Sequence, residues 1–312
     1  MSNKKKPDNK NISKVLGKTV NYPDQYDPSI LVREPRQNNR DTIDIKDDNL
    51  PFVGYDTWNC YEVSTLNENG LPITGVVKII YPCDSKYIVE SKSLKLYLNS
   101  FNMYKTPGHG YEFVSNHVSG AIERDLCKLL ETNVNAHFHN TLDFSRTRPI
   151  FNHADYLTLE NVDCVEDILI DVYSESPNLL EIESVNIPTD CNGSFGVSQW
   201  YHSSLLKSNC RVTAQPDWGD VYIYMNSHHS INTTSLLKYI ISFRDECHFH
   251  EEICETIYKR LSDVYMPSKL MVTCLYTRRG GIDINPTRAS SADILPRDLI
   301  DPSILHCKTL KQ

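Results

Sequence analysis

The stretch Gly75-Val76-Val77-Lys78-Ile79-Ile80-Tyr81 decides the fold, because a run this rich in β-branched and aromatic residues predicts a strand. Tyr87-Ile88-Val89 predicts a neighbouring strand. Apolar residues then recur at helical spacing twice, over residues 94–101 and 118–130, before residues 134–138 return to a strand pattern. This part of the chain therefore predicts strands, two consecutive helices and a further strand.

The downstream part of the chain repeats this order. Residues 221–224 predict a strand, residues 236–243 and 249–265 predict two helices, and residues 269–276 and 282–284 predict two closing strands. We therefore expect an α+β fold built from two tandem units, each an antiparallel sheet with a helix pair on one face.

Domain boundaries follow from the composition along the chain. Residues 1–50 are polar and are expected to form an extended arm, ordered only where Tyr22, Tyr26 and Leu31 find a surface. An N-terminal module is expected over residues 51–165 and a C-terminal module over residues 166–312. The remaining local expectations are a loop over 103–116, strands over 167–173 and 180–184, and a short helix over 199–206.

The overall composition excludes several classes of protein. The chain has 312 residues, of which 40% are hydrophobic and 23% charged, as in globular proteins. A formal net charge of -8 argues against direct binding to nucleic acid, and no apolar run approaches the roughly 20 residues of a membrane span. The lysine-rich start lacks the apolar core of a secretory signal, and the 10 cysteines include no C-x-x-C pair, so we expect reduced thiols and a cytoplasmic location.

Residues 204–219 combine a thiol with a carboxylate. A β-branched pair favours a strand over 210–214, and a proline and a glycine fix the turn around Asp217, so Cys210 and Asp217 are expected to face one pocket. A thiolate attacks electrophilic carbon, and a carboxylic acid can supply the proton that the resulting anion needs. The alternative is structural, since a buried cysteine often acts as a small hydrophobe and an aspartate before Trp-Gly is often a turn residue.

Two other segments carry groups that suit an anionic ligand. Residues 90–97 (ESKSLKLY) lie at a predicted strand-to-helix junction, where hydroxyls, lysines and free backbone N–H groups favour a phosphate; the alternative is a capped helix with solvated lysines. Residues 277–286 (TRRGGIDINP) join two arginines to two glycines that permit close backbone approach; the alternative is an exposed hairpin turn. Neither a Rossmann nor a P-loop sequence is present, so a nucleotide cofactor would bind in another mode.

Residues 247–254 (CHFHEEIC) permit two interpretations. On a helix, Cys247, His250, Glu251 and Cys254 would share one face, and cysteine and histidine are the usual zinc ligands. The spacing matches no common zinc pattern, and we expect no metal. His250 and Glu251 suit a donor and acceptor pair for a ligand ring, because a carboxylate accepts hydrogen bonds from ring N–H groups.

Taken together, these segments resemble the NADPH-dependent 7-cyano-7-deazaguanine reductases, the nitrile reductases of queuosine biosynthesis, in their long two-module form. The resemblance runs from about Leu16 to Arg288. The segments that carry it stand in family order: 48–52 (DNLPF), 90–102 (ESKSLKLYLNSFN), 205–219 (LLKSNCRVTAQPDWG), 242–244 (SFR), 249–251 (FHE) and 276–286 (YTRRGGIDINP).

The resemblance implies tandem tunnelling-fold modules, an active site where the modules meet, and a homodimer. At the matching positions Cys210 would attack the nitrile carbon to give a covalent thioimide, and Asp217 would donate the proton. The other implied residues are Val89, Glu90, Ser91, His250 and Glu251 for the substrate, and Ser91, Lys92, Arg279 and Gly280 for NADPH.

The implied reaction converts 7-cyano-7-deazaguanine to 7-aminomethyl-7-deazaguanine, a step in a tRNA modification pathway. A nitrile accepts hydride poorly, and covalent addition of a thiol turns it into a C=N group that accepts hydride readily. Reduction to the amine takes four electrons, hence two NADPH, and the imine must stay enclosed from water between the two transfers. Arginine and lysine suit the 2′-phosphate of NADPH.

Two alternatives belong to other functional classes. The tunnelling fold also occurs in zinc-dependent pterin-forming hydrolases, for which the 247–254 face would have to bind metal. A non-catalytic purine-binding module would form no covalent adduct, and its ligand binding would survive Cys210→Ala.

Overall fold

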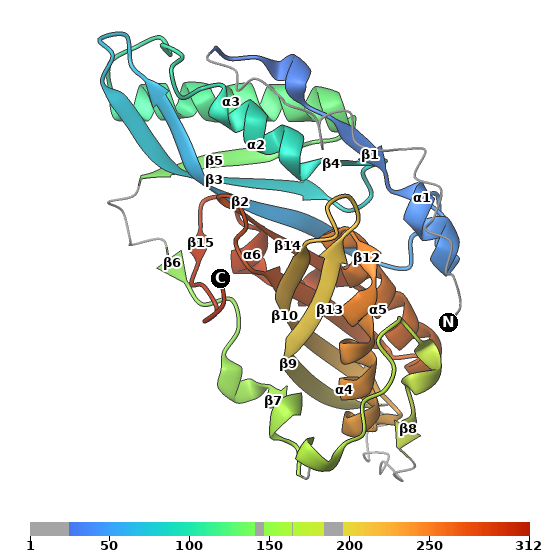
Figure 1. Cartoon of the computed structure of the whole chain (residues 1–312). Helices are drawn as coiled ribbons and strands as arrows, with labels where there is room; N and C mark the ends of the chain where they lie inside the picture. Colours follow the sequence, from blue (N-terminus) through green and yellow to red (C-terminus); the bar gives the residue numbers. More distant parts are fainter. Residues whose placement is uncertain (1–24, 141–146, 164, 184–195) are drawn as a thin grey trace.

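The structure, a computed structural model, describes residues 25–140, 147–163, 165–183 and 196–312, and a nine-stranded sheet forms its centre (Figure 1). Each neighbouring pair is antiparallel except at one edge, where two short strands run parallel to the same long strand. In spatial order the strands are β12 (Cys247–His248), β9 (Val197–Cys210), β10 (Pro216–Ser227), β13 (Lys269–Tyr276), β14 (Ile282–Ala289), β2 (Val53–Leu66), β3 (Pro72–Pro82) and β5 (Asn135–Asn140), with β7 (Leu157–Thr158) also paired to β9.

Four helices cover one face of this sheet: α2 (Ser91–Asn99), α3 (Tyr111–Leu130), α4 (Thr233–Ser242) and α5 (His250–Tyr265). Ile282 and Ile284 of β14 pack in one hydrophobic cluster with residues of α2 and α3. Arg288, on the same side of β14, donates a hydrogen bond of 2.9 Å to Glu255 of α5. Because side chains two residues apart on a strand share a face, both helix pairs lie on the same face, and the predicted α+β class is confirmed.

The C-terminal segment, with α6 (Arg297–Ile300) and β15 (Leu305–His306), covers the opposite face. Lys78 of β3 reaches into it, and burial lowers the pKa of this lysine to about 7. Its Nζ donates to three carbonyl oxygens there, those of Asp298 (3.1 Å), Asp301 (2.8 Å) and Ile304 (2.6 Å). The sheet is thus enclosed on both sides. No helix in the described ranges is long and apolar enough to cross a membrane.

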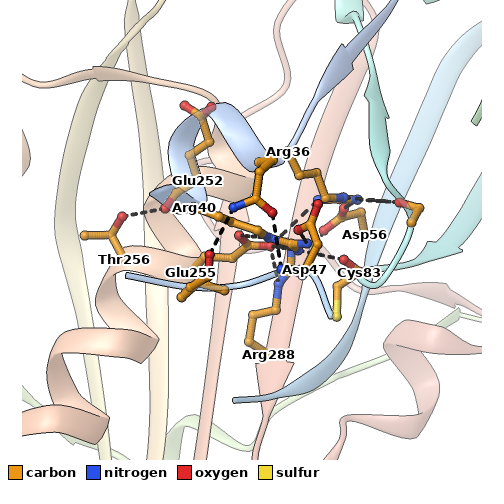
Figure 2. A network of polar contacts seen from close by, with 12 residues as sticks. Arg36, Arg40, Asp47, Asp56, Cys83, Glu252, Glu255, Thr256 and Arg288 are labelled. Atoms are coloured by element: carbon orange, nitrogen blue, oxygen red, sulfur yellow. Dashed lines mark hydrogen bonds and ion pairs between the residues drawn. The ribbon is translucent and has the colours of Figure 1, made fainter. Parts of the chain in front are cut away.

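The predicted arm is wrong for residues 25–50, which belong to the folded body. Its residues Arg36 and Arg40 are 4% and 0% exposed, and their side chains make buried ion pairs that the polar composition conceals (Figure 2). Tyr26 and Leu31 pack against the helices as expected, whereas Tyr22 lies outside the described residues. The elements of this segment are η1 (Pro28–Ile30), β1 (Arg33–Pro35), α1 (Gln37–Arg40) and η2 (Asp41–Ile43), with β1 antiparallel to β4 (Tyr87–Val89).

Other differences from the predicted elements are local. Residues 199–206 are not a helix but lie inside β9, because Trp200 and Tyr201 favour a strand and pairing with β10 extends it. The predicted loop over 103–116 is shorter, since α3 begins at Tyr111.

The segment between the two halves holds few regular elements. Residues 168–173 form no strand, and of 180–183 only β8 (Ile182–Glu183) is extended; Ser184 lies outside the described residues. The last predicted strand runs on beyond residue 284 to Ala289. Two further short strands are β6 (Thr147–Arg148), which pairs with β15, and β11 (Ser230–Ile231), which pairs with β8. The other short helices are η3 (His153–Asp155), η4 (Leu159–Asn161), η5 (Val165–Asp167), η6 (Pro177–Leu179), η7 (Phe243–Asp245) and η8 (Ala292–Ile294).

Candidate active site

A narrow cavity is lined by residues from both halves of the sheet. The first half contributes from β2, β4 and the start of α2, and the second from β9, β10, β12, α5 and β14, together with Phe249 and the turn before β14. The lining residues are Trp58, Val89, Ser91, Cys210, Asp217, His248, Phe249, His250, Glu251, Arg279 and Ile284. Most of the residues implied by the resemblance therefore meet in one place.

The thiol of Cys210 stands at the end of a strand, beside a tight turn. β9 ends at Cys210, whose N–H donates to the Gln215 carbonyl (2.8 Å) and whose carbonyl accepts from the Ala214 N–H (2.9 Å). The thiol therefore lies on a strand as predicted, but the strand does not continue to residue 214: residues 211–215 form a hairpin turn, in which Ala214 takes a positive φ of 54°. Asp217 pairs with Ser208, two residues before Cys210, so thiol and carboxylate share a face of the hairpin.

Asp217 is held by two cationic or potentially cationic side chains. Its carboxylate is 5% exposed and lies 2.9 Å from Nη1 of Arg279 and 3.5 Å from Nε2 of His250. The His250 ring packs edge-on against Tyr276, with ring centroids 4.0 Å apart. These contacts fix the carboxylate at the wall of the cavity.

Glu251, in the first turn of α5, is a buried acceptor without a donor. It is 2% exposed, and its Oε1 has no hydrogen-bond partner among the described residues. Burial and, after it, the nearby Asp56 carboxylate raise the pKa of this carboxyl to about 8, against the opposing effect of Arg36. A buried oxygen of this kind suits a ligand that brings N–H groups.

The N-terminus of α2 is capped by Glu90. Its carboxylate accepts from the N–H groups of Lys92 (3.0 Å) and Ser93 (2.7 Å), so both oxygens serve the helix. Glu90 is buried and does not line the cavity, whereas Ser91 does. For Glu90, the alternative interpretation of residues 90–97 as a capped helix is therefore correct.

A second cavity is lined by Gly280, which does not line the first cavity. Gly280 and Gly281 have φ of 57° and 77°, a left-handed conformation that suits glycine. Lys95 also lines this cavity, and burial, then Arg279 and Lys92, lower its pKa. The sequence reasoning missed Lys95, although it is the second lysine of the 90–97 segment.

His248 and Trp58 are two further lining residues that were not predicted. Burial alone would lower the pKa of His248, but hydrogen bonding to Glu246 and Glu252 raises it to about 9. Trp58 is 1% exposed, and its Nε1 has no partner among the described residues. The local sequence does not reveal that a tryptophan in a strand lines a cavity. His248 could have been found, because it lies within the 247–254 segment.

The helix face proposed for zinc does not form. α5 begins at His250, so Cys247 lies on β12 and outside the helix. Cys254 is buried, and its Sγ donates to the carbonyl oxygens of Val272 (3.5 Å) and Pro286 (3.6 Å). Within the described ranges no group of three or more His, Cys, Asp or Glu side chains is placed to hold a metal ion.

Two family models match the chain. One, described as "Nitrile reductase, 7-cyano-7-deazaguanine-reductase N-term", matches residues 22–138. The other, described as "QueF-like protein", matches residues 216–293. A solved structure of an archaeosine synthase QueF-Like in the apo form covers 31% of this chain and 94% of its own, at a TM-score of 0.27 and 15% identity, an overlap too low to bear on the fold.

Curated relatives match over most of their length. The NADPH-dependent 7-cyano-7-deazaguanine reductase of Psychrobacter cryohalolentis is 38% identical over 286 residues, covering 90% of this chain and 95% of the relative. Proteins of the same name from Coxiella burnetii (39% over 279 residues; 88% and 91%) and Ralstonia nicotianae (41% over 277 residues; 88% and 92%) are similar to the same extent. The chain therefore belongs to the NADPH-dependent 7-cyano-7-deazaguanine reductase family and is an oxidoreductase.

Proposed function

We propose that this chain reduces the nitrile of 7-cyano-7-deazaguanine to 7-aminomethyl-7-deazaguanine through a covalent thioimide on Cys210. The observation that carries the proposal is one cavity lined by a thiol, an anchored carboxylate and an unpartnered buried carboxylate. The names of the relatives supply the substrate and the cofactor.

Substrate recognition falls to the first turn of α5. Glu251 accepts hydrogen bonds from N–H groups of the deazaguanine ring, and His250 contacts the ring beside it. Val89 and Ser91 also line the cavity. Glu90 acts indirectly, because it fixes the N-terminus of α2 and with it Ser91.

In the covalent step, Cys210 Sγ bonds to the nitrile carbon and one C–N π bond opens. The thiol proton ends on the nitrile nitrogen, and Asp217 carries it there, so atoms and charge balance in the thioimide. Arg279 and His250 keep Asp217 oriented during the transfer. The buried position of Asp217 and the walls from both halves of the sheet exclude water from the intermediates.

The residues beside the cavity fit the anionic cofactor. Lys95 lines the second cavity with Gly280 and Gly281, where its positive charge suits the cofactor phosphates and the two glycines permit close backbone approach. Ser91, Lys92, Arg279 and Gly280, joined by Lys95, would hold NADPH. NADPH, when bound, supplies the two hydrides that reduction of a nitrile to an amine requires.

The quaternary and domain arrangement belongs to the same proposal. Residues 51–165 and 166–312 are two modules of the tunnelling fold, and two chains form a homodimer in the cytoplasm. The joint use of both halves to line one cavity supports the modular arrangement. Sedimentation equilibrium of the purified chain tests the dimer.

The decisive experiment incubates the purified chain with 7-cyano-7-deazaguanine and NADPH and follows both NADPH loss and amine formation. We expect two NADPH per amine, no turnover in Cys210→Ala, and normal turnover in Cys247→Ala, which removes an exposed thiol from the neighbouring strand β12. Without NADPH, intact-mass spectrometry should show an adduct of the nitrile on the wild-type chain and none on Cys210→Ala. Binding of the nitrile with neither adduct nor NADPH loss would instead indicate a purine-binding module.

A further inference from the structure

The turn between β13 and β14, residues 277–281, carries two adjacent arginines with different partners. Arg279 lines the cavity, and its Nη1 lies 2.9 Å from the Asp217 carboxylate. Arg278 stacks on Tyr61 of β2, with its Cζ 3.5 Å from the centre of the ring. Tyr61 follows Cys60, whose side chain packs with the helices, so Tyr61 lies on the opposite face of the sheet. The turn therefore makes contacts on both faces of the sheet.

A buried carboxylate fixes the Tyr61 ring in position. The Tyr61 hydroxyl donates to Oδ2 of Asp283 (2.6 Å), and Asp283 is 1% exposed. The other oxygen of this carboxylate, Oδ1, accepts from the side-chain amides of Asn59 (2.7 Å) and Asn285 (2.6 Å). Lys308 of the C-terminal segment also donates to Oδ2, at 3.1 Å. Because several donors hold the carboxylate, the hydroxyl that binds it is held as well.

The backbone of the turn contacts the same tyrosine. The Tyr61 N–H donates to the Gly281 carbonyl (2.8 Å), and within the turn the Arg279 N–H donates to the Ile282 carbonyl (2.9 Å). Gly280 and Gly281 have positive φ angles, and glycine has many other conformations open to it. A turn with two adjacent glycines therefore needs contacts outside itself to keep one conformation, and Tyr61 supplies two of them.

The C-terminal segment fixes the strands that flank the turn. Gln312 Nε2 donates to the carbonyl of Tyr276, where β13 ends (3.0 Å), and to Oδ1 of Asn285 on β14 (2.8 Å). This segment lies beyond residue 293, where the match to the second family model ends. Since both strands are anchored, the conformational freedom that remains lies in residues 277–281 themselves.

We propose that Tyr61 is a positioning residue for the cofactor: its ring holds Arg278 and so keeps the turn in the conformation that places Arg279 at the cavity. This inference rests on the proposed function, which assigns NADPH to Arg279 and Gly280. Tyr61 lines neither of the two cavities described above, so it acts through the turn. The inference also gives a role to Arg278, the first arginine of the 277–286 segment.

The first test measures NADPH binding by fluorescence titration in a Cys210→Ala background, which prevents adduct formation with the nitrile. Tyr61→Leu should weaken NADPH binding about 3- to 10-fold, as expected for loss of a partly exposed cation–π contact. Tyr61→Phe keeps the ring and should bind NADPH as the background protein does. Affinity for 7-cyano-7-deazaguanine, measured by calorimetry, should be the same in all three proteins. Equal NADPH affinity in Tyr61→Leu and Tyr61→Phe would overturn the inference.

Tyr87→Leu is the matched control for a general loss of stability. Arg33 stacks on Tyr87 with its Cζ 3.7 Å from the ring centre, so this variant removes the same kind of contact away from the turn. It should lower the urea midpoint of unfolding as Tyr61→Leu does, and it should leave NADPH affinity unchanged. If both variants lost NADPH affinity equally, the loss would come from general loosening of the fold, and the inference would be wrong.

Limited digestion with trypsin tests the turn without any ligand, because trypsin cleaves after Arg278 and Arg279. Cleavage there should be faster in Tyr61→Leu than in wild type or Tyr87→Leu, since proteolysis follows the population of locally opened states. Mass spectrometry of the fragments identifies the cleaved bond. The same cleavage rate at the turn in all three proteins would show that Tyr61 does not fix it.

Arg278→Ala covers the case in which Tyr61→Leu does not fold, because Arg278 is exposed. It should weaken NADPH binding as much as Tyr61→Leu and speed cleavage after Arg279; an unchanged affinity contradicts the inference. The double variant should bind no more weakly than either single variant, whereas additive losses would mean that Arg278 binds NADPH independently of Tyr61. If the wild-type chain binds no NADPH, the cofactor site of the proposed function fails, and trypsin digestion still decides whether Tyr61 fixes the turn.

Discussion

Two carboxylates one turn apart on α5 have the same burial and opposite chemistry. Glu251 and Glu255 are each 2% exposed. Arg288, Arg40 and Arg36 outweigh the effect of burial on Glu255 and lower its pKa to about 2, whereas burial raises the pKa of Glu251 to about 8. The charged groups around a buried acid, and not its degree of burial alone, therefore decide whether it is ionised.

The difference separates a residue that holds the fold from one that waits for a ligand. Glu255 has its donors within the chain, from Arg40 and Arg288. Glu251 has an oxygen without a partner among the described residues, at the wall of a cavity. A substrate with ring N–H groups would donate hydrogen bonds to Glu251, as the arginines do to Glu255.

The largest expected effect comes from removing the better-paired acid. Glu255→Gln leaves three buried arginines with one carboxylate fewer, and breaking such a network costs on the order of 3–5 kcal/mol of unfolding free energy. Urea titration measures it. A loss below about 1 kcal/mol would mean that Glu255 contributes no more than an exposed pair.

Glu251→Gln should have the opposite profile. It removes an uncompensated buried acid, so stability at pH 8 should stay equal or rise, while affinity for 7-cyano-7-deazaguanine should fall on the order of 10- to 100-fold through loss of charged hydrogen bonds. Calorimetry in the Cys210→Ala background and urea titration give the two values. Loss of stability with full affinity would reverse the roles assigned to the two acids.

The two acids should also impose opposite pH dependences on stability. The folded pKa of Glu251 lies above its ordinary value of 4.5, so its contribution is complete below pH 4.5 and is lost as pH rises through about 8. The folded pKa of Glu255 lies below 4.5, so its contribution is present above pH 4.5 and is lost as pH falls through about 2.

A difference measurement isolates the Glu251 contribution. The free energy of unfolding of wild type minus that of Glu251→Gln should fall between pH 5 and 9, by on the order of 1–3 kcal/mol. Thermal unfolding without substrate at a series of pH values checks this. A flat difference would show that Glu251 is already ionised in the free protein.

The smallest expected effect lies on the solvent side of the same helix. Lys259 and Asp263 form an i,i+4 pair with Nζ 2.5 Å from Oδ2, and the aspartate side chain is 47% exposed. Lys259→Ala should cost no more than about 0.5 kcal/mol, because water and salt screen such pairs. Urea titration at low and high salt measures it, and a cost near that of Glu255→Gln would contradict the role given to desolvated partners.

Local sequence patterns were sufficient to predict most of the regular elements. β13 was predicted with its bounds, and α5 to within one residue, because period and punctuation are encoded within a few residues. The helix predicted over 199–206 failed because pairing with β10, a tertiary effect, decides that segment. The prediction of an extended arm was wrong for a related reason. Arg40 binds Glu255, which is 215 residues away in the sequence, and no local pattern reveals this ion pair.

The site shows the same division. Cys210, Asp217, His250, Glu251 and Arg279 stand in motifs, and the structure brings them to one cavity; their roles remain proposals. Trp58 was missed because a tryptophan in a strand looks like an ordinary core residue. Lys95 stood in a quoted motif, but its burial depends on the turn at Gly280, whose approach the sequence does not show.

Pairing of β14 with β2 joins the end of the second half to the start of the first, with Ala289 opposite Val53 and Ile282 opposite Cys60. A ribosome delivers β2 long before β14, so throughout synthesis β2 presents an edge of unsatisfied backbone N–H and C=O groups. A chain that stops before β14 would keep that edge open and tend to associate with other strands. The edge of β2 is therefore covered only after β14 has been synthesised. Until then, this edge is the part of the sheet that most needs protection by a chaperone.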